Sequence, residues 1–405
     1  MIIRVVCRHR ARSWAPWATP DLRMLLFAYL SAAAVPDLSA LQARLDRIAV
    51  QYNTSYSVGV MHSEFGAFGV ASGLADKVGG AKATTESRYP VGSVTKTWTA
   101  AAVLQLHERG LVDIDASVAQ YVDAILTREN GTTMAALWTD PKTGVVDPFV
   151  HKITARLLMG MRAGLHDYND TWYYDVTMND PTYDVTPYDI LHRLNKTFVC
   201  EPGLCGKYAS PGFEILGLLV AQMTGATRWE EYDQLSVLPP ALRGDFTRTA
   251  FPLRGICADV PHIVHQYAAP FWSSTDGGVQ KIIDFYYDSC LNGWSCGNLA
   301  AGPIDIARFH YHLHNYDIVT RATVESMMQW EPMSIGWDPQ LYGLAMMQTW
   351  PTRGWAWGPD PLNETYLVGH GGADYGSTGI VSGWNPMHKF GISVTSNSAG
   401  PLNCR

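Results

Sequence analysis

The sequence predicts an α/β (α+β) fold: an antiparallel sheet built from both chain ends, flanked by helices, with a mostly helical inserted domain. Strand-like segments lie near the start of the chain, in residues 55–72, and near its end, in residues 376–397. The segments between them have helical spacing. The 405 residues exceed what one compact core usually holds. We therefore assign residues 35–115 and 320–405 to the sheet domain and residues 116–319 to the helical domain.

The strand-like segments are recognised by alternation and by their turns. Residues 55–72 are rich in Val, Phe and Gly and predict two strands around a turn near His62. Residues 376–384 and 389–397 predict a second hairpin, which turns at Asn385-Pro386. Both ends of the chain therefore supply strands to one sheet.

Three stretches between the hairpins have helical patterns. In the first, apolar residues recur at three- and four-residue spacing, and each stretch is followed by a glycine that can end a helix. The stretches are residues 94–109 before Gly110, residues 152–162 before Gly164, and residues 212–224 before Gly225. Two further segments, residues 128–148 and 245–300, are irregular and predict loop insertions, the second on the surface and tied by disulfides.

Composition excludes several classes of partner. The formal charge is −7, from 30 basic and 37 acidic residues, whereas a nucleic-acid-binding protein needs a basic face. No apolar run reaches the roughly 18 residues needed to span a bilayer, so we expect no stable membrane span. The hydrophobic fraction of 47% is that of a globular protein.

Residues 1–34 predict a secretory signal peptide. Basic residues precede a short apolar stretch from Met24, which ends in small residues near Ala33 and Ala34. Met24 is an alternative start of translation. Because the first twenty residues are rich in Arg and lack acidic residues, a mitochondrial transit peptide is the alternative destination signal.

Cysteines and glycosylation sequons favour the secreted, extracellular location. Cleavage would remove Cys7 and leave six cysteines, of which Cys200 with Cys205 and Cys290 with Cys296 are close enough for small disulfide loops. Sequons for N-glycosylation begin at Asn53, Asn130, Asn169, Asn195 and Asn363. The alternative is that the cysteines are ordinary thiols and the sequons are chance triplets.

The chemistry begins at Ser93-Val94-Thr95-Lys96. A serine at the start of a helix lies where backbone N–H groups and the positive end of the helix dipole can stabilise an oxyanion. A lysine three residues later projects from the same face, beside the serine hydroxyl. The tetrad alone is weak, because a chain of this length contains about one by chance.

The surroundings of this tetrad resemble the serine β-lactamase-related family, which includes class C β-lactamases, D-alanyl-D-alanine carboxypeptidases and related esterases with a penicillin-binding-protein-like fold. The resemblance covers about residues 40–400. It rests on four blocks in the family's order: residues 88–97 around Ser93 and Lys96, residues 153–168, residues 208–217 beginning Tyr208-Ala209-Ser210, and residues 368–373 with His370-Gly371-Gly372-Ala373. The chain departs from the family at Met161, where a His is frequent, at Ala163, which replaces a Ser, and at Ser210, where Asn is commoner.

The resemblance implies a serine hydrolase that forms an acyl-enzyme. Ser93 would be the nucleophile, and Lys96 and Tyr208 would together remove its proton, with both pKa values lowered by a cluster of cations. The backbone N–H groups of Ser93 and Ala373 would form the oxyanion hole. The substrate-binding residues would be Ser210, His370, Gly371 and Gly372, with His370 donating a hydrogen bond to the substrate or to Tyr208.

The expected substrate is a small ester or amide, or a peptide, and no cofactor or metal is expected. β-Lactamase or D-alanyl peptidase activity is an alternative within the family, and a catalytically inactive binding or regulatory protein on the same scaffold is the alternative from another class. His310, His312 and His314 alternate in a helical segment and could hold zinc, but a solvated helix face is favoured because no carboxylate or cysteine motif lies nearby.

Overall fold

The computed structural model describes residues 37–168, 170–268, 282–337, 340–349, 366–374 and 376–398. The expected signal peptide, Cys7, Cys404 and the sequons at Asn169 and Asn363 lie wholly or partly outside these residues. Within them, no helix is long and apolar enough to cross a membrane.

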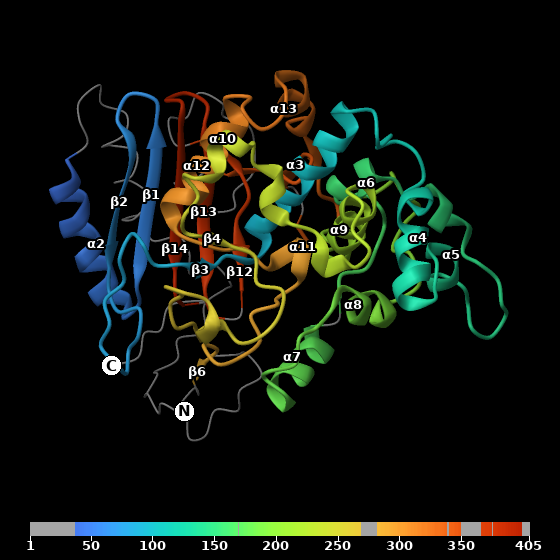
Figure 1. The fold of residues 1–405 in the computed structure, drawn as a ribbon, viewed down its shortest axis with the longest axis horizontal. Helices are drawn as coiled ribbons and strands as arrows, with labels where there is room; N and C mark the ends of the chain where they lie inside the picture. Colours follow the sequence, from blue (N-terminus) through green and yellow to red (C-terminus); the bar gives the residue numbers. More distant parts are fainter. Residues whose placement is uncertain are drawn as a thin grey trace.

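One large sheet organises the described residues, and it joins the two ends of the chain (Figure 1). Its strand order is β2-β1-β14-β13-β11-β10-β9-β8, with β12 also paired to β13. Every pairing in it is antiparallel; in β1 and β14, for example, Val58 lies opposite Val394. The strands are β1 (Tyr56–His62), β2 (Gly66–Ser72), β8 (Glu331–Pro332), β9 (Leu341–Tyr342), β10 (Met347–Thr349), β11 (Leu367–Gly369), β12 (Gly372–Ala373), β13 (Thr378–Asn385) and β14 (Phe390–Ser396). The predicted antiparallel sheet and both predicted hairpins are confirmed.

Helices cover the two faces of this sheet. Helix α2 (Leu38–Tyr52) is capped by the Asp37 side chain and buries Leu41, Leu45 and Ile48 against the strands. Helix α12 (Pro303–His314) packs on the other face of β1 and β14, as the alternation of side chains along a strand requires. Glycines allow this close approach: a Cβ at Gly59 would lie 2.2 Å from the backbone of Pro303.

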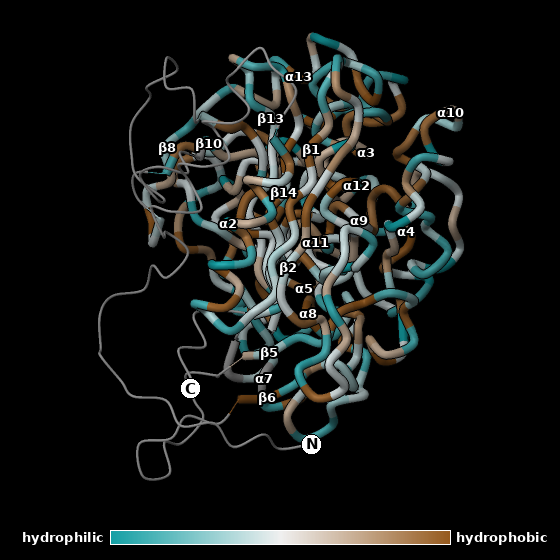
Figure 2. The backbone as a smooth tube through the Cα atoms, turned by 90° about the vertical axis from the view of Figure 1, so that its left-hand side faces the viewer, coloured by the Kyte–Doolittle hydropathy of each residue, from teal (hydrophilic) through white to brown (hydrophobic). Residues whose placement is uncertain are grey.

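The remaining helices gather around α9 (Pro211–Met223), in which residues 211–221 are all buried. It packs against α3 (Thr95–Glu108), α4 (Ala119–Asn130), α6 (Ala155–Met159), α8 (Pro187–Arg193) and α11 (Trp294–Gly297). Apolar side chains of these helices form one buried cluster, and Figure 2 shows hydrophobic segments running through the body of the molecule. The other helices are α5 (Met134–Leu137), α7 (Asp170–Asn179), α10 (Pro240–Arg243) and α13 (Arg321–Met327).

Several predicted elements differ from the observed ones. The expected loop at residues 128–148 includes the end of α4 and helix α5, and the helix expected over residues 152–162 is shorter. The expected surface position of residues 245–300 is wrong for its last part, because Trp294 and Leu299 are fully buried. Helix α12 packs on the sheet although it falls in the range assigned to the helical domain. The division into two domains stays a prediction.

The disulfides are confirmed for one expected pair and wrong for the other. Cys200 bonds to Cys205 as expected, but Cys290 bonds to Cys257 rather than to Cys296. The Cys296 thiol is buried in the core and is not in a disulfide. The expected Cys290–Cys296 loop does not form because Cys296 packs in the main core cluster, whereas Cys290 lies with Cys257 in a separate small cluster.

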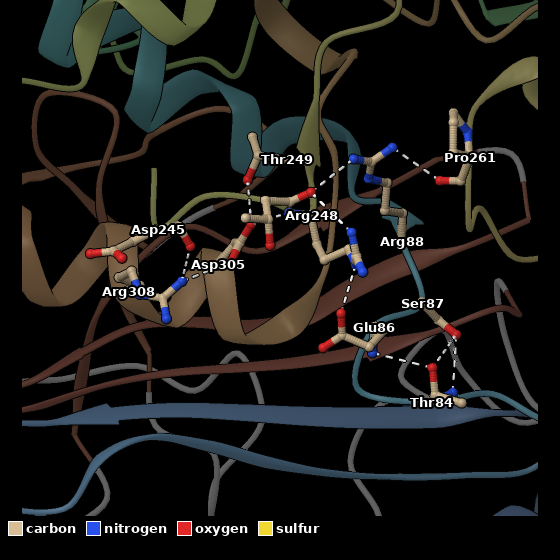
Figure 3. A network of polar contacts seen from close by, with 11 residues as sticks. Thr84, Glu86, Ser87, Arg88, Asp245, Arg248, Thr249, Pro261, Asp305 and Arg308 are labelled. Carbon is tan, nitrogen blue, oxygen red and sulfur yellow. Dashed lines mark hydrogen bonds and ion pairs between the residues drawn. The ribbon is translucent and has the colours of Figure 1, made fainter. Parts of the chain in front are cut away.

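A polar network joins the small sheet that precedes Ser93 to helix α12 (Figure 3). This sheet contains β3 (Tyr89–Pro90), β7 (Ala300–Ala301) and β4 (Thr249–Ala250). Asp305 on α12 accepts hydrogen bonds from the Arg248 backbone at 2.7 Å and the Thr249 hydroxyl at 3.0 Å. Arg248 in turn pairs with Glu86 at 2.7 Å. The network holds the strands that lead into the turn that carries Ser93.

Candidate active site

Ser93 lies in a tight turn between β3 and α3. The turn η1 (Gly92–Val94) is a single 3-10 turn, and Gly92 has a φ of 51°, which favours glycine. A Cβ at Gly92 would also lie 2.1 Å from the Ala373 carbonyl oxygen, so glycine lets β12 approach the turn. This turn brings Ser93 to the first turn of the helical segment, as the sequence predicts.

Helix α3 begins with threonines although β-branched residues are weak helix formers. Their buried hydroxyls each donate to a backbone carbonyl: Thr95 to Gly92 at 2.7 Å, Thr97 to Ala345 at 2.9 Å and Thr99 to Ser295 at 2.6 Å. The buried hydroxyls are thereby satisfied. These bonds also fix the helix that carries Lys96 against its neighbours.

Ser93, Lys96 and Tyr208 meet at one oxygen atom. Lys96 Nζ donates to Ser93 Oγ at 2.8 Å, and the Tyr208 hydroxyl donates to the same atom at 2.7 Å. Lys96 is fully buried and also donates to the Cys296 carbonyl oxygen at 2.9 Å. The three residues expected to carry the chemistry are therefore in direct contact.

Burial and neighbouring groups together set the pKa values at this centre. Burial raises the pKa of Tyr208 above its usual value, against the opposing effect of Lys96. Burial alone would lower the pKa of Lys96, but Tyr208, the Cys296 thiol and Asp167 outweigh it and raise that pKa overall. The expectation that a cation cluster lowers both pKa values is wrong. Both groups hold their protons at neutral pH.

Strand β12 lies against the turn that carries Ser93. A Cβ at Gly372 would lie 2.0 Å from the Val91 carbonyl oxygen and 2.8 Å from the Ser93 nitrogen. Gly372 and Ala373 pair with β13, and this pairing fixes their position relative to Ser93. The two residues expected to supply oxyanion-hole N–H groups, Ser93 and Ala373, therefore lie beside each other.

An open pocket of about 280 Å³ lies over this centre. It is lined by Ser93, Asp167, Tyr168, Tyr208, Ser210, Trp337, Gly371, Gly372, Ala373, Thr378, Gly379 and Ile380. Of the residues expected to bind substrate, Ser210, Gly371 and Gly372 line it. The apolar and aromatic walls, with a few polar groups, are typical of a small-molecule site.

His370 is placed differently from the expectation. It is fully buried behind the pocket, and its Nε2 atom is 2.9 Å from the Tyr342 hydroxyl rather than bonded to Tyr208. Burial lowers the pKa of His370 to about 3, so the ring is neutral. The His370 side chain can be buried in the core because Tyr342, on β9, is a polar partner for it there.

Sequence reasoning gave no role to several pocket residues, among them Asp167 and Trp337. Asp167 lies in the second resembling block, and its Oδ1 atom accepts the Ser210 N–H at 2.9 Å. Trp337 stacks on Tyr208 with ring centroids 4.6 Å apart. The position of Asp167 within a resembling block was a usable signal, whereas no pattern marks Trp337, which reaches the site from a loop distant in sequence.

The residue after Ala373 is tied to the disulfide-bearing segment. Asn292 donates to the carboxyl group of Asp374 and accepts the Tyr173 hydroxyl at 2.9 Å. Burial raises the pKa of Asp374 to about 7. These hydrogen bonds join α7, the residues before α11 and the end of β12. Because the three segments are far apart in the sequence, no local pattern predicts the contact.

The histidines considered for zinc do not form a solvated face, and that expectation is wrong. His310 and His314 are buried between α12 and the sheet, where His314 stacks on Trp384 and its Nδ1–H donates to the His310 carbonyl oxygen at 2.9 Å. His312 pairs instead with Asp317. Among the residues that the structure describes, no group of three or more His, Cys, Asp or Glu is arranged to hold a metal ion.

Known structures share this fold. A D-stereospecific amidohydrolase from Streptomyces sp. aligns with 89% of this chain and 94% of its own at 19% identity, with a TM-score of 0.67. D-amino acid amidase from Ochrobactrum anthropi SV3, complexed with L-phenylalanine, aligns with 89% of this chain and 91% of its own at 18% identity and a TM-score of 0.66. A penicillin-binding protein from Bacillus halodurans aligns with 89% and 97% at 18% identity, with a TM-score of 0.66.

A family model, described as Beta-lactamase, matches residues 45–405. The matched range includes the Ser93 turn, α9 and β12, and it covers most of the chain. The chain belongs to the Beta-lactamase family.

Proposed function

We propose that the protein is a serine hydrolase that cleaves a small amide or ester through an acyl-enzyme on Ser93. The observation that carries this proposal is the convergence of Lys96 Nζ and the Tyr208 hydroxyl on Ser93 Oγ at the floor of an open pocket. A serine hydroxyl is a weak nucleophile unless a neighbouring group takes its proton. Two such groups are within hydrogen-bond reach of it.

In acylation, Ser93 Oγ forms a bond to the substrate carbonyl carbon. The Ser93 proton passes to the Lys96–Tyr208 pair, after that pair has lost one proton to solvent, and then to the leaving amine or alcohol. The Ser93 and Ala373 N–H groups hold the negative charge that develops on the carbonyl oxygen. Water then attacks the acyl carbon, gives its proton to the same pair, and Ser93 regains its hydrogen as the acid product leaves.

The proposed substrate class is the amide or ester of a small amino acid or short peptide. Two of the similar structures are a D-stereospecific amidohydrolase and a D-amino acid amidase, which supports an amide of a D-amino acid. The pocket volume of about 280 Å³ suits a single residue with an apolar side chain. Asp167 brings a carboxylate to the pocket, and it would favour a substrate with an ammonium group.

The experiment is covalent labelling read by intact mass. Wild type and Ser93→Ala are incubated with a fluorophosphonate, a penicillin and a p-nitrophenyl ester, and amides of D- and L-phenylalanine are tested for release of ammonia. We expect adducts and turnover in wild type that are absent in Ser93→Ala. No adduct and no turnover in a folded wild-type protein would favour the alternative, a non-catalytic binding protein on this scaffold.

We also propose that the protein is secreted. The Cys200–Cys205 and Cys257–Cys290 disulfides support an oxidising compartment. Asn53 and Asn195, which begin two of the sequons, are exposed and accessible to a glycan. Expression of the full chain in a secreting eukaryotic cell should give a protein in the medium whose mass falls on treatment with an N-glycosidase; retention in mitochondria would contradict the proposal.

A further inference from the structure

A second titratable group lies behind the Ser93 centre. Glu214 is on α9, one helical turn after Ser210, and is fully buried. In the described part of the chain, neither of its carboxyl oxygens has a hydrogen-bond partner of good geometry. A buried carboxyl group without a full set of partners is costly to the folded state. An apolar residue would suit this position on a buried helix better.

Glu214 lies beside Cys296, the residue whose backbone carbonyl accepts a hydrogen bond from Lys96. The Cys296 thiol and Ser295 are the polar groups beside its carboxyl group. The Cys296 carbonyl oxygen accepts the hydrogen bond from Lys96 Nζ at 2.9 Å, and Lys96 donates to Ser93. A Cβ at Gly293 would lie 2.7 Å from Cys296 Sγ and 3.8 Å from Glu214 Oε1, so only a glycine leaves room there. Glu214, Cys296 and Lys96 thus form a continuous buried series that ends at Ser93.

The charges in this series depend on one another. No carboxylate of the described residues forms an ion pair with Lys96. Two titratable groups face Glu214: Lys96 from α3 and the Cys296 thiol from α11. On the pocket side, Tyr208 and Asp167 interact electrostatically with Lys96. Burial raises the pKa of Glu214 to about 7 and raises the pKa of Cys296 well above its usual value. Below neutral pH, Lys96 is therefore the charged member of the series.

A narrow cavity adjoins this series at Lys96 and Cys296. It has a volume of about 30 Å³ and is lined by Ser93, Lys96, Asn292 and Cys296, among others. That volume is enough for one water molecule, and the lining offers several polar atoms to hold it. A proton can therefore exchange between the buried series and the solvent.

We propose that Glu214 is a positioning residue that controls the charge of Lys96: with its proton on, it leaves Lys96 able to release a proton, and once ionised it holds Lys96 as an ammonium and slows attack by Ser93. The inference rests on the proposed function of the Ser93 centre. The physical reason is that a negative charge in a low-dielectric interior favours the protonated forms of both Lys96 and Tyr208. Each then has less of the basic form that can accept the Ser93 proton.

The test is the rate of fluorophosphonate labelling of Ser93 from about pH 5 to about pH 9 in wild type, Glu214→Gln and Asp305→Asn. Glu214→Gln keeps the volume of the side chain and removes its titration. We expect a break in the wild-type profile near pH 7, where Glu214 ionises, and no break in Glu214→Gln. Because one pKa unit at Lys96 changes the fraction of its neutral form about tenfold, Glu214→Gln should gain up to about tenfold over wild type on the alkaline side.

Asp305→Asn is the matched control. Asp305 is also a buried acid, but it lies in the network of Figure 3, with Arg248, Thr249 and Arg308 as partners. This variant should lose stability and keep the wild-type break. Glu214→Met is the second test variant, because an apolar side chain suits the site; it should fold at least as stably as wild type and also lack the break.

Each outcome bears on the proposal. A break that persists near pH 7 in both Glu214→Gln and Glu214→Met would overturn the role of Glu214 while leaving the proposed function intact. Loss of the break in Asp305→Asn would also overturn it, because the break would then report any buried acid. No labelling of wild type at any pH would overturn the proposed function itself, and this inference with it.

Discussion

The indole ring of Trp337 lies parallel to the phenol ring of Tyr208, with centroids 4.6 Å apart and planes inclined by 4°. Lys96 Nζ lies 5.2 Å from the centre of the same phenol ring. The Tyr208 ring, whose hydroxyl bonds to Ser93, thus contacts Trp337 on its pocket side and Lys96 toward the core. The direction of the hydroxyl depends on both.

Replacing Trp337 should therefore disturb the position of the Tyr208 ring while leaving the Ser93, Lys96 and Tyr208 side chains themselves unchanged. A stacked aromatic pair contributes about 0.5–1.5 kcal/mol beyond its buried area, so Trp337→Ala should lower kcat/KM by about tenfold, whereas Trp337→Phe should retain most of it. Steady-state kinetics on an active amide or ester would measure both. Equal losses in the two variants would show that the stacking does not matter and that only the indole N–H does.

Tyr208→Phe separates the hydroxyl from the ring. The phenylalanine ring can still stack on Trp337, but the 2.7 Å hydrogen bond to Ser93 Oγ is lost. General acid and base groups contribute about 10²–10⁴-fold, so kcat should fall by that order with KM little changed. Tyr342→Phe is the control, because Tyr342 bonds to His370 rather than to Ser93. A Tyr208→Phe variant with wild-type kcat would leave Lys96 as the sole proton acceptor.

Asp167 should make the enzyme prefer substrates that carry a positively charged ammonium group. Its Oδ1 atom accepts the Ser210 N–H, and an asparagine at this position keeps an oxygen for that bond. A hydrogen bond to a charged group contributes about 1.5–3 kcal/mol, so Asp167→Asn should raise KM for an amino acid amide by roughly 10- to 100-fold. The same amide with its amino group acetylated is the comparison. If both substrates lose equally, the role of Asp167 is to hold the Ser210 segment.

Local patterns predicted the sheet and the contact between Ser93 and Lys96, but they did not predict contacts between segments distant in sequence. The hairpins of residues 55–72 and 376–397 were visible because strand alternation and turn residues are local signals. Ser93 and Lys96 are three residues apart on one face, and Tyr208 came from the resembling block. Trp337, the Cys257–Cys290 bond and the His370–Tyr342 contact depend on how loops return to the core, and no period or spacing marks them.

The two disulfides should differ in their effect on stability. Cys257 and Cys290 are 33 residues apart and close a much longer loop than Cys200 and Cys205, which are 5 apart. From loop-closure entropy, Cys257→Ala with Cys290→Ala should cost about 4 kcal/mol, and Cys200→Ala with Cys205→Ala about 2 kcal/mol. Denaturant unfolding of the paired variants measures this. A larger loss for the short loop would mean that local packing around Gly164, against Cys200, outweighs the entropy.

The stability of the protein should fall as the pH rises through neutrality, and Glu214 should account for part of that fall. Its pKa is raised from 4.5 to about 7 by burial, so the folded state binds this proton more tightly than the unfolded chain does. The stabilising contribution is therefore complete below the unfolded value and is lost as the pH rises through about 7. From the size of that shift, the free energy of unfolding of wild type should fall relative to Glu214→Gln by on the order of 3 kcal/mol between about pH 4 and about pH 8.

Urea unfolding of both proteins across this range isolates the Glu214 contribution, because every other titrating group is common to the two. Asp374 also has a pKa raised to about 7, so each protein alone should lose stability in the same window, and only the difference between them reports Glu214. A difference that stays constant with pH would mean that Glu214 titrates alike in the folded and unfolded states. In that case its carboxyl group must reach solvent or a partner that its buried position on α9 does not provide.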